Sequence, residues 1–278
     1  MQIRLLTTAD IPFGLRLSAQ NHWNQLEADW RRQLDLEPDG CFLAESVNQP
    51  GGTACCCVFG NIAWINLVLV DRDQRGHGIG TALLRHVIAH LDEVGVKTIR
   101  LDATPLGQPI YEKLGFVGEF ALVRLDGVMP ATCEPVSNVE PLTRADLPAI
   151  IALDEAITQT PRAKLLQHLF EVAPDTMRKF APAGRLEGYC LSRPGANAWH
   201  VGPILGTPEA GRRLLLDAAR RYAGQRVYLD VPTDHARAVA LAQSLGLTAQ
   251  RPFLRMSRGP RLTENLDCFW SAFGPEKG

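Results

Sequence analysis

The sequence repeats itself at an interval of nearly half its length. Residues 6–12 (LTTADIP) return as residues 142–148 (LTRADLP), 136 positions later. Two shorter matches follow in the same order, residues 101–105 with 229–233 and residues 114–116 with 245–247. In both copies of the first segment a Thr and an Asp stand where they can cap a following helix. Because about 130 residues make an ordinary domain, the pattern predicts two domains of one fold in tandem.

The join between the two copies is expected at residues 129–137. Pro130 and Pro135 interrupt both the helical and the strand periodicity there. The predicted organisation is therefore an N-terminal domain at residues 1–130, a second domain at residues 137–258 and a C-terminal tail at residues 259–278.

Composition and charge exclude several classes of protein. The 278 residues are 46% hydrophobic and 21% charged, which is typical of globular domains and argues against long disorder. The formal net charge of −1 gives no basic field for nucleic acid or an anionic membrane. We find neither a run of about 18 apolar residues nor a secretory signal, so we expect a cytoplasmic protein.

The first copy alternates helical and strand patterns. Helices are expected at residues 10–21 and 25–36 and strands at 41–46, 52–59 and 62–70, with turn formers such as Asn48 and Gly60 between the strands. After Gly78 the apolar spacing becomes helical, and one face carries Ile79, Leu83, Val87, Leu91 and Val94. A strand at 98–103, a short helix at 108–114 and a strand at 116–125 complete the copy. The predicted fold class is α/β, with a mixed sheet of the α+β kind.

Seven cysteines stand at positions 41, 55, 56, 57, 133, 190 and 268. Their number is odd, and their spacing fits neither a disulfide framework nor a CxxC metal site. Cys55, Cys56 and Cys57 fall in an expected strand, whose alternation would bury one or two of them as small apolar side chains. We favour this packing role over a catalytic thiol.

A glycine-rich turn separates the strand at 62–70 from the helix that follows. It reads Arg75-Gly76-His77-Gly78-Ile79-Gly80-Thr81. Glycines let the backbone approach an anion, the free N–H groups of a helix start favour phosphate, and Arg75 adds a fixed positive charge. A tight turn without a ligand is the alternative interpretation. The spacing differs from a Walker loop, which needs Lys-Ser or Lys-Thr after the glycines, and from the dinucleotide fingerprint Gly-x-Gly-x-x-Gly.

These residues resemble the GNAT superfamily of N-acetyltransferases. The family motif Arg/Gln-x-x-Gly-x-Gly/Ala between a strand and a helix is matched by Arg75, Gly78 and Gly80. Further on, residues 110–116 (IYEKLGF) are similar to the family signature Leu-Tyr-x-Lys-x-Gly-Phe. The match covers residues 1–128, and the tandem arrangement resembles a bacterial subgroup of two-domain members. The resemblance implies transfer of an acetyl group from acetyl-CoA to a small-molecule or peptide amine, without a metal.

The resemblance also implies roles for particular residues. The backbones of Leu69 and Val70 would pair with the pantetheine arm of CoA. The pyrophosphate would be held by the N–H groups of Arg75, Gly76, His77, Gly78, Ile79, Gly80 and Thr81. Tyr111 would protonate the departing thiolate, although half-buried packing is the alternative role for a Tyr in this place. Thr104 stands where the family often has Asn, and it can offer one hydrogen bond.

No general base is evident in the sequence. Members of the family that use a carboxylate on the central strand would place it near Trp64 or Asn66, and neither side chain can take a proton from an ammonium. The remaining candidates, acting through water from the region of the first two helices, are His22, Glu27 and Asp29. Each of these also has a structural interpretation, as a capping, packing or solvated helix residue.

The second copy keeps the order of the strands and helices but lacks the residues of the motif. Strands are expected at 188–191 and 198–205, yet residues 206–213 contain no Arg-x-x-Gly-x-Gly, and the position that matches Tyr111 is Ala242. We therefore expect a degenerate domain that completes the acceptor pocket, stabilises the first domain or forms an interface, in a monomer or a homodimer. A cleft between the domains could be lined by Arg162, Tyr189, Trp199, His200 and Asp230. A structural role is the alternative for each of them. The alternative function is that of a non-catalytic acyl-CoA-binding sensor.

Overall fold

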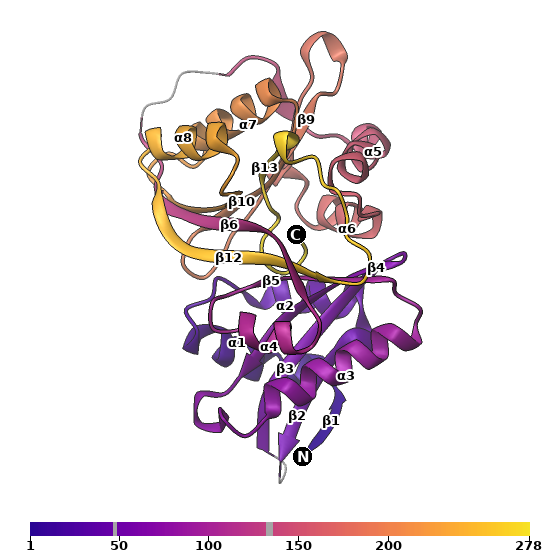
Figure 1. Cartoon of the computed structure of the whole chain (residues 1–278). Coiled ribbons are helices and arrows are strands. Elements are labelled where there is room, and N and C mark those ends of the chain that lie inside the picture. The colour runs from indigo at the N-terminus through magenta and orange to yellow at the C-terminus, as the bar shows by residue number, and fades with distance from the viewer. Residues whose placement is uncertain (47–48, 132–135) are drawn as a thin grey trace.

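Two halves of similar construction are joined in a computed structural model that describes residues 1–46, 49–131 and 136–278 (Figure 1). The first half contains β1 (Gln2–Leu5), α1 (Ile11–Gln20), α2 (Glu27–Leu36), β2 (Cys41–Ser46), β3 (Gln49–Phe59), β4 (Ile62–Val70), α3 (Ile79–Glu93), β5 (Thr98–Ala103), α4 (Gln108–Lys113) and β6 (Val117–Val128). The second half contains β7 (Val139–Pro141), α5 (Leu147–Thr158), α6 (Ala163–Val172), β8 (Arg178–Phe180), β9 (Gly188–Arg193), β10 (Trp199–Gly206), α7 (Pro208–Arg221), β11 (Arg226–Pro232), α8 (Ala236–Ser244), β12 (Thr248–Arg258) and β13 (Phe269–Ser271). Asn48, Cys133 and Pro135, which the sequence analysis named, lie outside the described residues.

The strand order of the sheet is symmetric about its centre. The order is β1-β2-β3-β4-β5-β12-β6-β11-β10-β9-β8-β7, and β13 pairs with β10 off this path. β12 lies antiparallel to both β5 and β6, and β6 lies antiparallel to β11. β6 of the first half therefore pairs with strands of the second half, and β12 of the second half pairs with β5 of the first. This exchange joins the two halves in a single sheet (Figure 1). The strand expected at 116–125 exists as β6, but its partners belong to the second half.

The predicted repeat is confirmed by matching hydrogen bonds in the two halves. The backbone N–H of Thr7 donates to Asp10 Oδ2 at 2.8 Å. The backbone N–H of Thr143 donates to Asp146 Oδ2 at the same distance. In each half this pair fixes the turn between the first strand and the first helix, which is the capping role that the sequence predicts.

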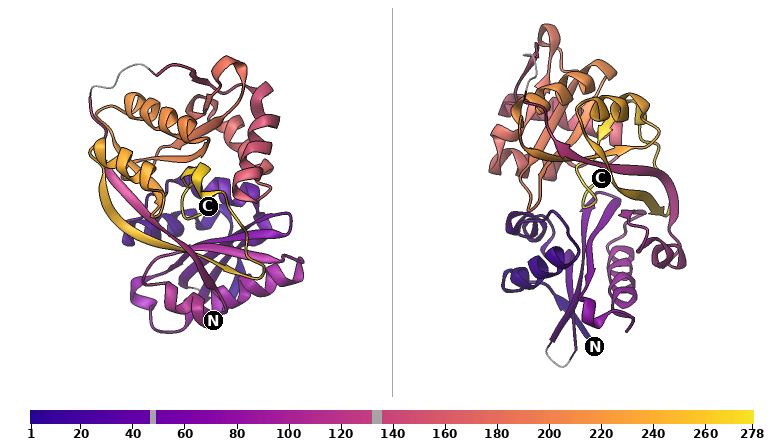
Figure 2. Two further views of the ribbon diagram at one scale, coloured as in Figure 1. Left: turned by 45° about the horizontal axis from the view of Figure 1, so that its top comes forward. Right: turned by 90° about the vertical axis from the view of Figure 1, so that its left-hand side faces the viewer.

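Helices cover both faces of the first half's sheet. α1 and α2 lie on one face and α3 lies on the other (Figure 2). β3 runs through the centre of this arrangement, between β2 and β4, so Cys55, Cys56 and Cys57 are all fully buried, rather than one or two of them. Burial raises the pKa of Cys57 to about 11, which keeps its thiol protonated at neutral pH. The six cysteines that the structure describes are unbridged.

α3 packs by the apolar face that the sequence predicts, with one exception. The first four residues of that face are buried against the sheet: Ile79, Leu83, Val87 and Leu91. Val94 lies beyond the last helical residue and is 55% exposed, so it does not belong to the packed face. Across the described parts of the chain, no helix is long and apolar enough to cross a membrane.

β4 separates from β5 part-way along its length. The two strands pair in parallel from Ile62 to Trp64, opposite Thr98 to Arg100. Beyond that point Leu67 has a φ of 49°, and the register between β3 and β4 shifts opposite this residue. A residue with a side chain costs roughly 1–3 kcal/mol in this conformation, so the packing that buries Leu67 has to hold it there. The bulge directs the end of β4 away from β5.

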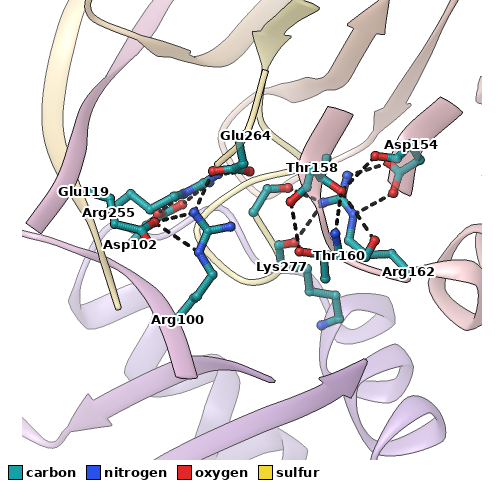
Figure 3. A network of polar contacts seen from close by, with 11 residues as sticks. Arg100, Asp102, Glu119, Asp154, Thr158, Thr160, Arg162, Arg255, Glu264 and Lys277 are labelled. Carbon is teal, nitrogen blue, oxygen red and sulfur yellow. Dashed lines mark hydrogen bonds and ion pairs between the residues drawn. The ribbon is translucent and has the colours of Figure 1, made fainter. Parts of the chain in front are cut away.

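Residues 259–278 run back between the two halves. β13 pairs with β10, and buried ion pairs fasten the segment before it (Figure 3). Glu264 accepts from Arg100 Nη2 at 2.6 Å and from Arg255 Nη1 at 3.1 Å. Further along, the carbonyl of Lys277 accepts from Arg162 Nη1 at 2.9 Å. This segment is therefore part of the interior that the two halves share.

Candidate active site

A cavity of about 570 Å³ opens where β4 leaves β5. Most of the residues that the sequence analysis assigned to CoA and its chemistry line this cavity: Leu69, Val70, Arg75, Gly76, Gly78, Ile79, Gly80, Thr81, Thr104 and Tyr111. His77 is the exception, because its side chain is exposed and its Nδ1 lies 3.3 Å from Gln74 O. The structure thus brings the loop, the end of β4 and Tyr111 together around one space.

The loop ahead of α3 has the backbone of an anion site. Gly76 and Gly78 have φ angles of 81° and 78°, in the left-handed region that glycine adopts most readily. A Cβ at either position would meet no atom within 4 Å, so these glycines serve the path of the backbone rather than close packing. Gly78 is the N-cap of α3, whose first turn leaves N–H groups free at the positive end of the helix dipole. This environment suits a phosphate group.

Arg75 adds a positive charge at the mouth of the cavity. Its Nη2 donates to Asn21 Oδ1 at 2.7 Å, and its Nε lies 3.4 Å from Val70 O. Within residues 1–46, 49–131 and 136–278, no carboxylate forms an ion pair with it. The guanidinium is therefore held beside the loop with its charge available to an anionic ligand.

The Tyr111 side chain lines the cavity from α4. Its ring packs against Gly107, where a Cβ would come within 2.8 Å of it, and stands edge-on to Phe116 with ring centroids 6.0 Å apart. Burial raises the pKa of the phenol to about 12, so it stays protonated at neutral pH. Thr104 Oγ1 accepts a hydrogen bond from the N–H of Gly107 at 3.4 Å, so part of its bonding capacity serves the turn before α4.

The three residues considered as a general base lie away from the cavity. His22 and Glu27 are exposed, and Glu27 pairs with Arg31 at 2.5 Å on the surface of α2. Asp29 is buried, but its carboxylate pairs with Arg193 at 3.2 Å. None of the three lines the cavity, so none of them is placed to contact a bound acceptor directly.

Several polar residues that the sequence analysis did not assign to this site also line the cavity: Asn24, Gln25, Asp102, Arg124, Arg251 and Glu276. Arg124 is held by Asp230, with Nε and Nη2 donating at 2.8 and 2.7 Å. Arg251 lies beside it on β12 and has no carboxylate partner in the described part of the chain. No local pattern marks Arg124, Arg251 and Glu276, because they arrive by strand exchange and by the return of the last segment.

Asp102 reaches the cavity from a buried cluster of charges (Figure 3). Arg255 donates from Nε and Nη2 to its two oxygens at 2.8 and 3.0 Å, and Arg255 also contacts Glu264. Burial raises the pKa of Asp102 above its usual value, although the charge of Arg255 acts in the opposite direction. The pKa of Glu276, another carboxylate that lines the cavity, is lowered, because nearby charges, that of Arg193 first, outweigh the effect of burial.

In the second half a strand of the protein enters the equivalent gap in the sheet. β10 and β11 pair over two residues and then separate, as β4 and β5 do. β13 enters there and pairs with β10 at Ile204 and Leu205. Trp270 of β13 covers the start of α7, where a Cβ on Gly211 would come within 2.3 Å of its ring. β13 therefore occupies the gap between β10 and β11 that corresponds to the opening between β4 and β5, and the second copy has also lost the motif.

The residues considered for a cleft between the domains have structural roles instead. None of the five lines the cavity: Arg162, Tyr189, Trp199, His200 and Asp230. Arg162 and Tyr189 both donate to Asp154, and Asp230 holds Arg124. The other two pack against neighbours in the second half. Of the two roles considered for these side chains, the structural one fits them, because ion pairs and packing use their polar atoms.

Models of known protein families match both halves of the chain. An acetyltransferase (GNAT) family model matches residues 12–116, and an acetyltransferase (GNAT) domain model matches residues 150–270. The chain belongs to the GNAT acetyltransferase family. It carries two GNAT domains in tandem and is an N-acetyltransferase, an enzyme of acyl transfer from acyl-CoA. The resemblance inferred from two short motifs is confirmed.

Known relatives of this GNAT protein match most of its length. It is 29% identical over 229 residues to the uncharacterized N-acetyltransferase YitH of Bacillus subtilis (strain 168), which covers 80% of this chain and 78% of that protein. It is 23% identical over 240 residues to the holothin acyltransferase of Pseudoalteromonas sp. (strain SANK 73390), over 85% and 81% of the two chains. A solved structure from Pyrococcus horikoshii has the same fold, with a TM-score of 0.86 at 24% identity over 100% of this chain and 95% of that one.

Proposed function

We propose that the protein transfers an acetyl group from acetyl-CoA to a primary amine, and that its one active site lies in the first half. The observation that carries this proposal is that the loop ahead of α3, the end of β4 and Tyr111 line one cavity. An anion site, a strand edge and a proton donor are the features needed to hold CoA and to release its thiol. In the second half β13 takes the corresponding space.

In this proposal CoA lies along the end of β4. Leu69 and Val70 offer backbone groups to the pantetheine arm, as a neighbouring strand would. The pyrophosphate rests on the N–H groups of residues 75–81, with the guanidinium of Arg75 beside it. His77 contributes through its backbone alone, since its side chain does not line the cavity. Thr104 supplies one hydrogen bond near the thioester.

The reaction is a direct attack of a neutral amine on the thioester carbonyl. As the C–N bond forms, an electron pair moves onto the carbonyl oxygen, and a backbone N–H of β4 donates to that oxyanion. As the C–S bond breaks, Tyr111 protonates the sulfur, and the proton that leaves the new amide nitrogen restores the phenol. The products are an acetamide and the CoA thiol. Holding both substrates in line supplies much of the rate.

Thiol release from acetyl-CoA in the presence of possible acceptors tests this function. The panel comprises alkylamines, amino acids, peptides with free N-termini and holothin, which is included because a relative is named for it. Release above the rate of hydrolysis with at least one acceptor, together with the acetylated product, supports the proposal. Binding of acetyl-CoA without release for any acceptor would contradict it and would fit a sensor.

A further inference from the structure

A row of three charged side chains crosses the sheet where β6 and β12 join the two halves (Figure 1). Asp230 of β11 lies directly opposite Arg124 of β6, and Arg124 lies directly opposite Arg251 of β12. Arg124 donates from Nε and Nη2 to the two oxygens of Asp230 at 2.8 and 2.7 Å. Like charges that face each other across two strands destabilise a sheet. The row therefore has two guanidinium groups for one carboxylate.

The row ends at the cavity. The pairing of β12 with β5 stops at Leu254, opposite Ala103, the last residue of β5. Arg251 lies three residues before Leu254, so β5 has already ended where this side chain stands. Both arginines of the row line the cavity, together with Phe253, and the guanidinium of Arg124 lies 5.2 Å from the centroid of the Phe253 ring. The early end of β5 thus opens this part of the sheet to the cavity.

Both arginines keep nitrogen atoms that a ligand can reach. Among the residues that the structure describes, Arg124 Nη1 and the guanidinium nitrogens of Arg251 donate no hydrogen bond, and none of these atoms is fully buried. Burial lowers the pKa of Arg251 below its ordinary value, and the charge of Arg124 lowers it further. The cation of Arg251 is therefore unfavourable in its present surroundings, and an anion in the cavity would stabilise it.

Other charged groups of the cavity have partners or a place in CoA binding. The carboxylates of Asp102 and Glu276, which also line the cavity, accept hydrogen bonds from buried arginines at 2.8 and 3.0 Å. Arg75 stands beside the loop ahead of α3, where the proposed function places the pyrophosphate of CoA. The pyrophosphate thus has a cation of its own. Arg124 and Arg251, the arginine pair, are left for a second anionic group.

We propose that the arginine pair binds a carboxylate group of the acceptor, so that the substrate is an amine that also carries a carboxylate. This inference rests on the proposed function and narrows its substrate class. A planar guanidinium presents its donors in a fork that matches the two oxygens of a carboxylate. Such a ligand would give the row two negative charges for its two positive ones. A carboxamide of the same shape has the oxygen but no charge, so the site selects carboxylates over their amides.

Calorimetric titration of the CoA complex with matched carboxylates and amides tests the site without turnover. The pairs are glycine and glycinamide, β-alanine and β-alaninamide, and 4-aminobutyrate and 4-aminobutyramide, which vary the distance between the amine and the carboxylate. We expect the wild type to bind at least one carboxylate about 10-fold more tightly than its amide. No preference for any of the three carboxylates would overturn the proposal.

Arg251→Gln should lose the preference for the carboxylate. The substitution removes the charge but no hydrogen bond to the described residues, and unchanged affinity for CoA would show that the variant folds. Arg237→Gln, at an exposed position of α8, is the control for the loss of one positive charge and should keep the wild-type preference. The same preference in Arg251→Gln as in the wild type would overturn the site. Weaker binding of CoA itself by this variant would assign the pair to a phosphate of CoA and would also overturn it.

Titration with 2-aminoethylphosphonate distinguishes a carboxylate from a phosphate-like group on the acceptor. We expect β-alanine to bind more tightly, and tighter binding of the phosphonate would overturn the assignment to a carboxylate. Thiol release with the acceptor panel tests the transferase separately. Preference for a carboxylate without thiol release from any acceptor would contradict the proposed function and leave the anion site standing. Thiol release without that preference would do the reverse.

Discussion

Tyr111 and Ala242 occupy the same position in the two halves of the molecule. The carbonyl of Tyr111 accepts the N–H of Phe116, and the carbonyl of Ala242 accepts the N–H of Leu247, each at 3.1 Å. Both halves contain this turn, but only the first half has a Tyr side chain at this position. The proton donor is present in the half that has the cavity at the end of β4, and a methyl group replaces it in the half where β13 pairs with β10.

Tyr111→Phe removes the hydroxyl group and keeps the ring that packs on Gly107 and Phe116. We expect kcat for acetyl transfer to fall by about 10²–10⁴-fold, the usual contribution of a general acid, with little change in the Kd of acetyl-CoA. Thiol release and calorimetry measure the two quantities. Tyr222→Phe, in the second half, is the matched control and should keep the wild-type rate. An equal loss in the two variants would argue against a proton-donating role for Tyr111.

Gly76 and Gly224 form a matched pair for testing the loop. Their φ angles are 81° and 74°, and a Cβ on either would meet no atom within 4 Å. Ala at either position should lower the free energy of unfolding by about 1–2 kcal/mol, because the left-handed conformation is strained for a residue with a Cβ. Gly76→Ala should also weaken acetyl-CoA binding, whereas Gly224→Ala should not. If urea unfolding and calorimetry show the same loss of affinity for both, the loop has no special part in binding.

Asn66→Leu should make the protein more stable. The variant exchanges a buried amide, unpartnered among the described residues, for an apolar side chain of similar size. We expect the free energy of unfolding in urea to rise by about 1–3 kcal/mol, the usual cost of an unsatisfied buried group. A less stable variant would show that the amide of Asn66 serves the fold.

His200 makes the folded state sensitive to acid. Its side chain is fully buried, Nε2–H donates to Ala272 O at 3.1 Å, and burial lowers its pKa from 6.5 to about 4. The unfolded chain therefore takes up this proton at a higher pH than the folded one. The contribution of the buried, neutral His200 to the free energy of unfolding is complete above about pH 6.5. It is lost as the pH falls toward 4, by up to roughly 3 kcal/mol. His200→Gln keeps a donor for Ala272 and should reduce the difference between urea midpoints at pH 7 and pH 5; an unchanged difference would point to other groups.

Short-range features of the molecule could be predicted from the sequence. The caps at Thr7 and Thr143, the helix after Gly78 and the glycine loop depend on residues a few positions apart, and the structure contains them all. The burial of all three neighbouring cysteines could not be predicted, because it requires helices on both faces of β3. Alternation along one strand gives no sign of a second covering layer.

The part of the cavity wall that contains Gln25, Asp102 and Glu276 depends on contacts between residues far apart in the chain. Arg255 binds Asp102 across 153 positions, and Gln25 binds Glu276 across 251. Strand exchange and the return of the last segment bring these groups together, and neither leaves a local pattern. A buried ion pair and a ligand contact also leave the same sign in a sequence, so the sequence alone does not separate a cleft role for Arg162 from its ion pair with Asp154.

The stoichiometry of acetyl-CoA binding tests the central claim most directly, because that claim places one CoA site in a chain with two GNAT domains. Calorimetric titration should give one acetyl-CoA per chain for the wild type. Binding should be lost in Gly78→Val, since a β-branched residue is strongly disfavoured at the φ of 78° that the N-cap of α3 requires. Two molecules per chain, or one molecule still bound by Gly78→Val, would contradict the account.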